Sequence, residues 1–231
     1  MATRRGKQLE LQFPGGWGGA RRKAGRKAQA RRSVPHRARA KHARANPVHV
    51  TLRVSLKSLR SQFVFPTVRG AITAANRRGG MRFRVVHYSV QSNHIHLLVE
   101  ALDRRDLLEG VRGLSVSLAR RINRLLFRKG RLIADRWHGR ALTTPRAVRH
   151  ALVYVFGNAR KHGEPVGGID PLSSAPYFRG FREFPSKAPC ESDPKLVPRF
   201  ARGDPPPAPR SWLLSNGLLR RARISVHELP R

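Results

Sequence analysis

In the middle of the chain the apolar residues change their period several times, and the order of these periods constrains the fold more than any other feature. The segment VHVTLRV, residues 48–54, alternates polar and apolar side chains, which predicts a strand with one buried face. Residues 65–80 place apolar side chains at helical steps and end at a glycine pair, a stop signal for a helix. The segments MRFRVVHYSV (81–90) and HIHLLVEA (94–101) are rich in strand formers and flank the turn-like tripeptide QSN. They predict an antiparallel hairpin.

The remaining periodic segments predict a helix, a short strand and a last helix. Apolar residues recur at steps of three and four from Leu107 onward and mark one long amphipathic helix that ends near Gly130. The segment DRWHGRALTT is expected to contain a short strand. Thr144 and Pro145 are typical of an N-cap and a first-turn proline, and open a helix that stops at Gly163. The whole order favours an α+β fold, for which we expect a ferredoxin-like antiparallel sheet with helices packed on it.

Composition divides the chain into three zones. Residues 1–46 are rich in Lys and Arg, contain the single acid Glu10 and show no periodic pattern, so we expect a basic arm that is disordered when free. Residues 47–163 form the predicted folded domain, and residues 164–231 form a proline-rich C-terminal extension. Three apolar residues of this extension are candidates to dock back on the domain: Trp212, Leu213 and Leu214.

The charge balance predicts a polyanionic partner. The chain has 48 Lys and Arg against 13 Asp and Glu, a formal net charge of +35, which attracts phosphate backbones. An anionic membrane surface is the competing partner. No apolar run of about 18 residues could span a bilayer, and no apolar segment of a secretory signal follows the basic N-terminus. We therefore expect a cytoplasmic protein with no membrane partner. The single cysteine, Cys190, excludes an internal disulfide and a zinc finger built from paired cysteines.

Two histidines one residue apart stand in the predicted strand SNHIHLLVE. Because strand side chains alternate between faces, His94 and His96 share one face while Ile95 and Leu97 lie on the other. Two neutral imidazoles at this spacing can chelate one divalent cation. The alternative is a pair of partly exposed strand histidines that bind nothing. The few acids of the domain do not converge as a carboxylate two-metal nuclease requires.

The last predicted helix brings together a tyrosine and an amide. Tyr154 and Asn158 are four residues apart in HALVYVFGNARKHG and therefore lie on one helical face. Tyr154 lies at the edge of the apolar stripe, with its hydroxyl free to reach outward. The alternatives are an ordinary aromatic residue at the edge of the core and a polar residue near a helix C-terminus.

Taken together, SNHIHLLVE, the long basic helix, RWHGRALTTP and LVYVFGNARKHG resemble the single-tyrosine HUH transposases, in particular the bacterial REP-associated tyrosine transposase branch. The resemblance covers roughly residues 47–163. It implies that His94, His96 and Asn158 bind Mg²⁺ or Mn²⁺, and that Tyr154 is a nucleophile that forms a 5′-phosphotyrosine and frees a 3′-hydroxyl. The sequence departs from the family pattern after Asn158, where related proteins often have proline and this chain has Ala159.

The resemblance further implies a single-stranded or hairpin DNA substrate. Basic residues suited to phosphates and an aromatic residue able to stack on bases are the candidate DNA contacts: Arg120, Arg121, Arg124, Arg128, Lys129 and Trp137. A solvated basic helix face and a core tryptophan are the alternatives. Two other functions stay open, a catalytically inactive DNA-binding relic and a metal-dependent RNA-processing nuclease. The sequence also leaves open the choice between monomer and homodimer, and the choice of general base among His138, His150 and metal-bound water.

Overall fold

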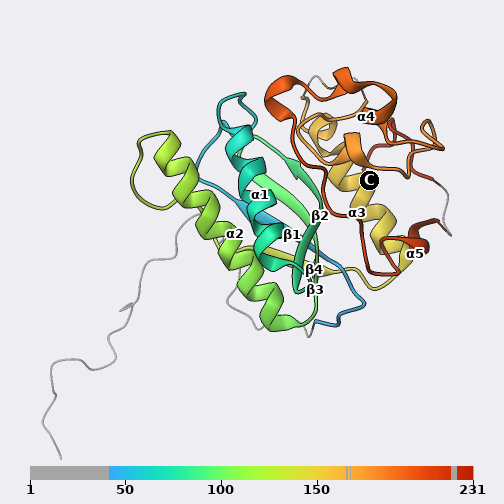
Figure 1. Cartoon of the computed structure of the whole chain (residues 1–231), viewed down its shortest axis with the longest axis horizontal. Coiled ribbons are helices and arrows are strands. Elements are labelled where there is room, and N and C mark those ends of the chain that lie inside the picture. The colour runs from blue at the N-terminus through green and yellow to red at the C-terminus, as the bar shows by residue number, and fades with distance from the viewer. Residues whose placement is uncertain (1–41, 165, 167, 220–222, 231) are drawn as a thin grey trace, which may run out of the picture. The chain divides into compact units, whose positions relative to one another are not determined.

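A four-stranded antiparallel sheet with the strand order β2-β3-β1-β4 is the centre of the fold (Figure 1). The computed structural model describes residues 42–164, 166, 168–219 and 223–230. The strands are β1 (Val48–Arg53), β2 (Phe83–Val90), β3 (His94–Ala101) and β4 (His138–Ala141). The long helices are α1 (Phe65–Gly79), α2 (Arg104–Leu125) and α3 (Pro145–Lys161). This element order and strand order confirm the predicted α+β, ferredoxin-like arrangement.

The apolar face of the sheet packs against α1 and α2, which lie side by side in Figure 1. Val50, Ile95 and Leu97 from the two central strands are fully buried in one core cluster with residues of both helices. Helix α2 approaches the sheet so closely that a Cβ atom at Gly110 would lie 2.1 Å from the ring of Phe83. Only glycine fits at that point of the helix.

Capping side chains fix where the helices begin. The side chain of Asp103 accepts a hydrogen bond from the backbone N–H of Asp106 at 2.7 Å and starts α2. The hydroxyl oxygen of Thr144 accepts one from Ala147 at 3.1 Å, and Pro145 is the first residue of α3. The predicted cap of the last helix is therefore confirmed.

The predicted end of the long helix near Gly130 is wrong, because α2 stops at Leu125. The N–H of Arg128 donates to the carbonyl of Asn123 at 2.9 Å and the N–H of Phe127 to that of Arg124 at 3.3 Å, the two bonds of a Schellman ending. Phe127 holds the left-handed position of this motif with φ 48°, where glycine is usual. Since no glycine marks the ending, the sequence pattern missed it, and Arg128 falls in the following loop.

The C-terminal extension covers the open edge of β2 and the outer side of α3. Ser174 N–H donates to Tyr88 carbonyl at 2.9 Å, and Val90 N–H donates to Leu172 carbonyl at 3.1 Å. These bonds extend the pairing beyond β2, so that this edge is not open to another chain. A second core cluster joins residues of α3 to the extension (Figure 1). Two of the three candidate docking residues, Leu213 and Leu214, are buried in it, whereas Trp212 is 47% exposed.

Within the described ranges, no helix combines the length and the apolar character that crossing a membrane requires. The basic arm predicted for residues 1–46 lies outside the described residues, except for its last part from residue 42 onward.

Candidate functional site

The polar face of the sheet carries the two histidines of β3. His94 and His96 lie on the face opposite to Ile95 and Leu97, as the alternation predicts. In the pairing of β1 with β3, Thr51 lies opposite His96 and Arg53 lies opposite His94. The two central strands therefore place polar and basic side chains around the histidine pair.

Helix α3 brings Tyr154 against this polar face. The ring of Tyr154 meets the ring of His96 edge to face, with centroids 5.1 Å apart. It also lies 5.7 Å from the ring of His49, a residue of β1. Asn158, one turn further along the helix, is fully buried. The tyrosine and the histidine pair, distant in sequence, thus meet at one place in the fold.

A cleft of about 670 Å³ opens at this meeting point. Of the four residues predicted to form the site, His94, His96 and Tyr154 line the cleft, while Asn158 lies beneath its surface. The remaining lining residues are mostly polar: Thr51, Arg53, Gln91, Ser92, Asn93, His138, His162 and Glu164. The cleft is therefore a polar depression with a basic side chain, a tyrosine and several imidazoles.

His96 is held in place by two polar neighbours on β1. It is only 3% exposed, so the alternative of a partly exposed strand histidine is wrong for this residue. Its Nδ1 atom lies 3.1 Å from the Oγ1 atom of Thr51 and 3.2 Å from the Nε2 atom of His49. The ring is consequently fixed from one side, with Nε2 as its remaining polar atom.

Three imidazoles of the site, those of His49, His94 and His96, are neutral at physiological pH. Burial, and then the nearby His49, His94 and His162, lower the pKa of His96 to about 2. Burial is also the main cause that lowers the pKa of His94 and of His49 to about 4 in each case. A neutral imidazole keeps a free lone pair, which is the form that binds a cation.

The buried polar atoms without partners fit a cation. Among the described residues, the Nε2 atom of His96 and both amide atoms of Asn158 are buried and make no hydrogen bond. An unpaired buried acceptor costs about 1–3 kcal/mol, and a cation would remove that cost. Two imidazole nitrogens and an amide oxygen are ligands that a transition cation such as Mn²⁺ accepts. Within the described part of the chain, no group of three or more His, Cys, Asp and Glu residues could hold a metal, so the fit depends on Asn158.

Tyr154 differs from the other two tyrosines of the chain. Tyr88 lies in the apolar core, where burial raises the pKa of its hydroxyl to about 12. Tyr177 accepts a hydrogen bond from Arg69 at 3.2 Å, and burial raises its pKa as well. Tyr154 is thus the tyrosine that faces the cleft of the histidine pair.

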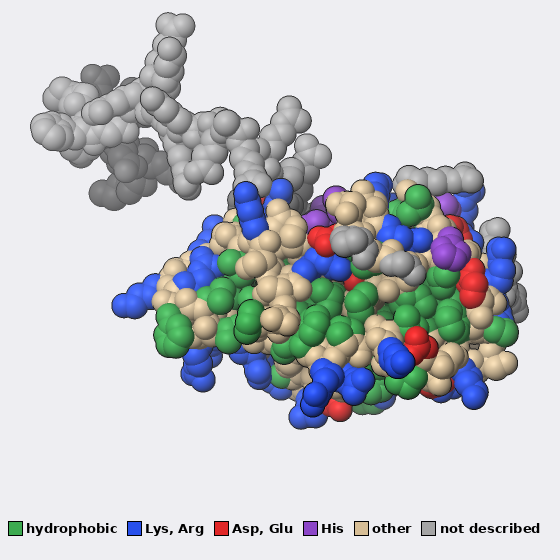
Figure 2. Space-filling view, turned by 90° about the horizontal axis from the view of Figure 1, so that it is seen from above, with side chains coloured by type: hydrophobic (Ala, Val, Ile, Leu, Met, Phe, Trp, Pro, Cys, Tyr) green, Lys and Arg blue, Asp and Glu red, His purple; other side chains and the backbone are tan. Residues whose placement is uncertain are grey.

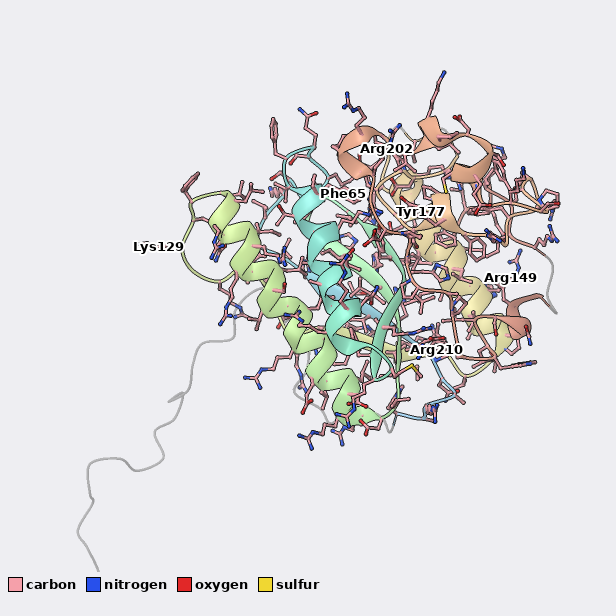
Figure 3. The ribbon with its side chains drawn as sticks, viewed as in Figure 1. Phe65, Lys129, Arg149, Tyr177, Arg202 and Arg210 are labelled. Atoms are coloured by element: carbon pink, nitrogen blue, oxygen red, sulfur yellow. The ribbon has the colours of Figure 1, made fainter. Side chains whose placement is uncertain are left out.

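The predicted DNA contacts fall in a different place. Helices α1 and α2 border a groove of about 900 Å³ that contains Arg120, Arg121 and Arg124, together with Arg78 and Arg112. Figure 2 shows basic side chains around the rim of one face of the molecule. Lys129 lies in the loop after α2, on the opposite side of the view from Arg149 of α3 (Figure 3). Since α1 and α2 cover the apolar face of the sheet, the groove lies on the other side of the sheet from the cleft.

The remaining predicted DNA contacts lie outside the arginine groove. Arg128 and Lys129 follow α2 in the loop and do not line the groove. Trp137 is half-buried and packs against the first core cluster, which favours the alternative of a core tryptophan. Of the two histidines among the candidate bases, His138 lines the cleft and His150 does not.

His49, Thr51 and His162 belong to the site but were not identified in the sequence. His49 and Thr51 occupy the polar positions of the alternating strand VHVTLRV, which was the only signal that they share a face. His162 lies one turn beyond Asn158, with its ring centroid 5.7 Å from that of His94. The strand register that brings the first two residues to His96 is a tertiary property that the sequence does not show.

The solved structures that are similar to this chain include the two described below. No family model and no curated protein matches the sequence. The chain is similar to a REP-associated tyrosine transposase bound to a REP hairpin, with a TM-score of 0.47 and 18% identity over 57% of this chain and 76% of that chain. It is also similar to a provisionally named transposase from Deinococcus radiodurans R1, with a TM-score of 0.37 and 15% identity over 58% of this chain and 98% of that chain. Both structures are described as transposases.

Proposed function

We propose that this chain is a metal-dependent enzyme that nicks and rejoins single-stranded or hairpin DNA through a 5′-phosphotyrosine at Tyr154. The observation that carries the proposal is the contact between Tyr154 and His96 at one polar cleft. A nucleophile and a cation ligand must both reach the scissile phosphate, and this contact is compatible with that requirement.

The proposed reaction exchanges one phosphate ester for another. The phenol oxygen of Tyr154 attacks phosphorus as its proton leaves, and the bond from phosphorus to the 3′-oxygen breaks. The 3′-oxygen takes up a proton and leaves as a hydroxyl, while the 5′-phosphate stays on the tyrosine. Because the covalent bond retains the energy of the broken ester, a different 3′-hydroxyl can reverse the step without ATP.

The residues of the cleft would hold the phosphate and the cation. His94, His96 and Asn158 would be the ligands of Mg²⁺ or Mn²⁺, which when bound would polarise the scissile phosphate. These three ligands carry no negative charge, so we expect the cation to bind weakly until the phosphate of the substrate completes the site. Arg53 also lines the cleft and would attract that phosphate.

The groove between α1 and α2 would bind a second part of the same DNA. Its five arginines are exposed, and Glu109 is the acid among its lining residues, so the groove suits a phosphate backbone. Contacts of this kind position a nucleic acid without reading its sequence. The groove would add affinity, and the cleft would carry out the chemistry.

A labelled, hairpin-bearing single strand with Mn²⁺, followed by denaturing electrophoresis, tests the proposal. We expect a covalent complex of protein and DNA, and expect His96→Ala to lose it while still binding DNA. Cleavage without a complex would indicate attack by water and an ordinary nuclease. Binding without any reaction would indicate an inactive DNA-binding protein, and cleavage of RNA alone would indicate an RNA-processing enzyme.

A further inference from the structure

We propose that His49 is a positioning residue that accepts a hydrogen bond from the Nδ1–H of His96 and thereby presents the unprotonated Nε2 of His96 as a cation ligand. The inference rests on the proposed function, because it assigns a role to a residue outside the predicted ligands. It concerns the tautomer of His96, which can be measured with or without a cation.

His49 and Thr51 each have a polar side-chain atom within hydrogen-bonding distance of the same atom, Nδ1 of His96. His49 and Thr51 lie two residues apart on β1 and share the polar face of the sheet. Thr51 is the register partner of His96, and His49 reaches it diagonally across the pair of strands. The Nε2 atom of His49 is 3.2 Å from Nδ1 of His96, and the two ring centroids are 5.2 Å apart.

The choice between two tautomers decides whether His96 can be a ligand. A neutral imidazole carries one proton, on either Nδ1 or Nε2. If His49 donated to Nδ1 of His96, the proton of His96 would lie on Nε2, a buried atom with no acceptor among the described residues. That arrangement would also point an N–H at the cation. If His49 accepts instead, the buried Nε2 atom has a lone pair for the cation.

The hydroxyl of Thr51 does not by itself determine which tautomer His96 adopts. Its hydroxyl lies 3.1 Å from the same Nδ1 atom, and a hydroxyl donates or accepts with equal ease. An acceptor nitrogen on His49 removes this ambiguity, in the way that partners of metal-binding histidines commonly fix the ring and its tautomer. His49 also lies against Tyr154, with centroids 5.7 Å apart, and so contacts both a predicted ligand and the predicted nucleophile.

Nitrogen-15 spectra of the histidine rings in the cation-free, full-length protein test the hydrogen bond directly. We expect Nδ1 of His96 to be protonated in the wild type and a mixture of tautomers in His49→Phe. A His49→Gln variant is the conservative replacement, because its side-chain oxygen can accept from the same Nδ1–H. Thr51→Val is the matched control, since it removes the other polar neighbour and should leave the tautomer of His96 unchanged.

Mn²⁺ affinity, measured from the paramagnetic resonance of the free ion, is the second readout. Loss of a partner that orients a metal ligand typically lowers affinity about 10–100-fold, and we expect this loss in His49→Phe. His49→Gln should recover most of the affinity. Equal losses in both variants, together with equal falls in Tm, would assign His49 a packing role and overturn the inference.

The two proposals fail in different ways. If the wild type binds no Mn²⁺, with or without DNA, the metal-dependent function is wrong, and the nitrogen spectra still decide the hydrogen bond. If the spectra of the wild type show the proton on Nε2 of His96, the role of His49 is wrong even where Mn²⁺ binds.

Discussion

Tyr154 of α3 and His96 of β3 contact each other edge to face, with ring centroids 5.1 Å apart, although a helix, a loop and a strand separate them in sequence. The contact arises because α3 packs on the face of the sheet that carries the histidines, while α1 and α2 cover the opposite face. The ferredoxin-like order therefore positions the two candidate functional side chains at one cleft.

The buried carboxylate of Glu100 connects the sheet to the C-terminal extension. It accepts from Arg84 at 2.8 Å, and from the backbone N–H groups of Arg210 and Ser211 at 3.0 Å and 2.7 Å. Arg210 lies beside the sheet in Figure 3. Removing the carboxylate in Glu100→Ala would leave the buried cation of Arg84 without its partner, so we expect a loss of about 3–5 kcal/mol in the free energy of unfolding.

Chemical denaturation measures this loss, and Glu109→Ala provides the control. Glu109 pairs with Arg105 at 2.8 Å, but both side chains are largely exposed. Exposed pairs of this kind contribute little to stability, because solvent screens them. If the two variants lose similar amounts, Glu100 does not connect the extension to the sheet.

Because His87 is buried and neutral in the folded protein, we expect a loss of stability in mild acid. It is buried between the rings of Phe156 and Phe178, and burial lowers its pKa from 6.5 to about 4. Between these values the unfolded chain takes up a proton that the folded protein does not, so stability is full above pH 6.5 and falls as the pH drops toward 4. Replacing His87 by Phe should reduce this fall. Denaturation of both proteins at about pH 7.5 and about pH 5 measures it, and an identical fall in both would contradict the prediction.

The arginine groove predicts a change in the salt dependence of DNA binding. Each phosphate contact with a single strand contributes about 0.7 to the slope of log affinity against log salt, so Arg120→Gln with Arg124→Gln should reduce the slope by about 1.4. Fluorescence anisotropy over a salt series measures the slope. The control replaces two exposed cations of the extension, Arg182 and Lys195, by Gln. A slope that changes equally in both variants would mean that only net charge matters.

Phe127 combines an unfavourable backbone conformation with an almost fully exposed ring. Its φ is 48° and its side chain is 98% exposed, at the end of the basic helix α2. A left-handed conformation costs a residue with a large side chain about 1–2 kcal/mol, and asparagine tolerates it better. We expect Phe127→Asn to raise the free energy of unfolding by about 0.5–1 kcal/mol. A decrease would contradict the cost assigned to the left-handed conformation of Phe127.

The sequence predicted the elements of the domain because each depends on local information. Alternation set the first strand, and strand-forming residues around a turn set the hairpin. Thr144 and Pro145 set the start of α3, and the shared face of His94 and His96 follows from the strand period alone. The end of α2 was missed because Phe127 occupies a position where glycine would have been the signal.

The parts of the site that were missed depend on tertiary structure. The contact of His49 with His96 requires the register of β1 against β3, and the burial of His96 requires α3 above the sheet. The separation of the arginine groove from the cleft likewise follows from which helix covers which face. Neither register nor the choice of face can be read from a single sequence.

Comparing the covalent complex of protein and DNA among three tyrosine variants tests most directly whether Tyr154 is the nucleophile. Tyr154→Phe removes only the oxygen that would attack phosphorus, so we expect unchanged folding and DNA affinity but no complex and no cleavage with Mn²⁺. Tyr88→Phe and Tyr177→Phe, which change the two tyrosines outside the cleft, should keep the complex. Denaturing electrophoresis of labelled hairpin DNA measures it, and a complex that persists in Tyr154→Phe would contradict the assignment of Tyr154 as the nucleophile.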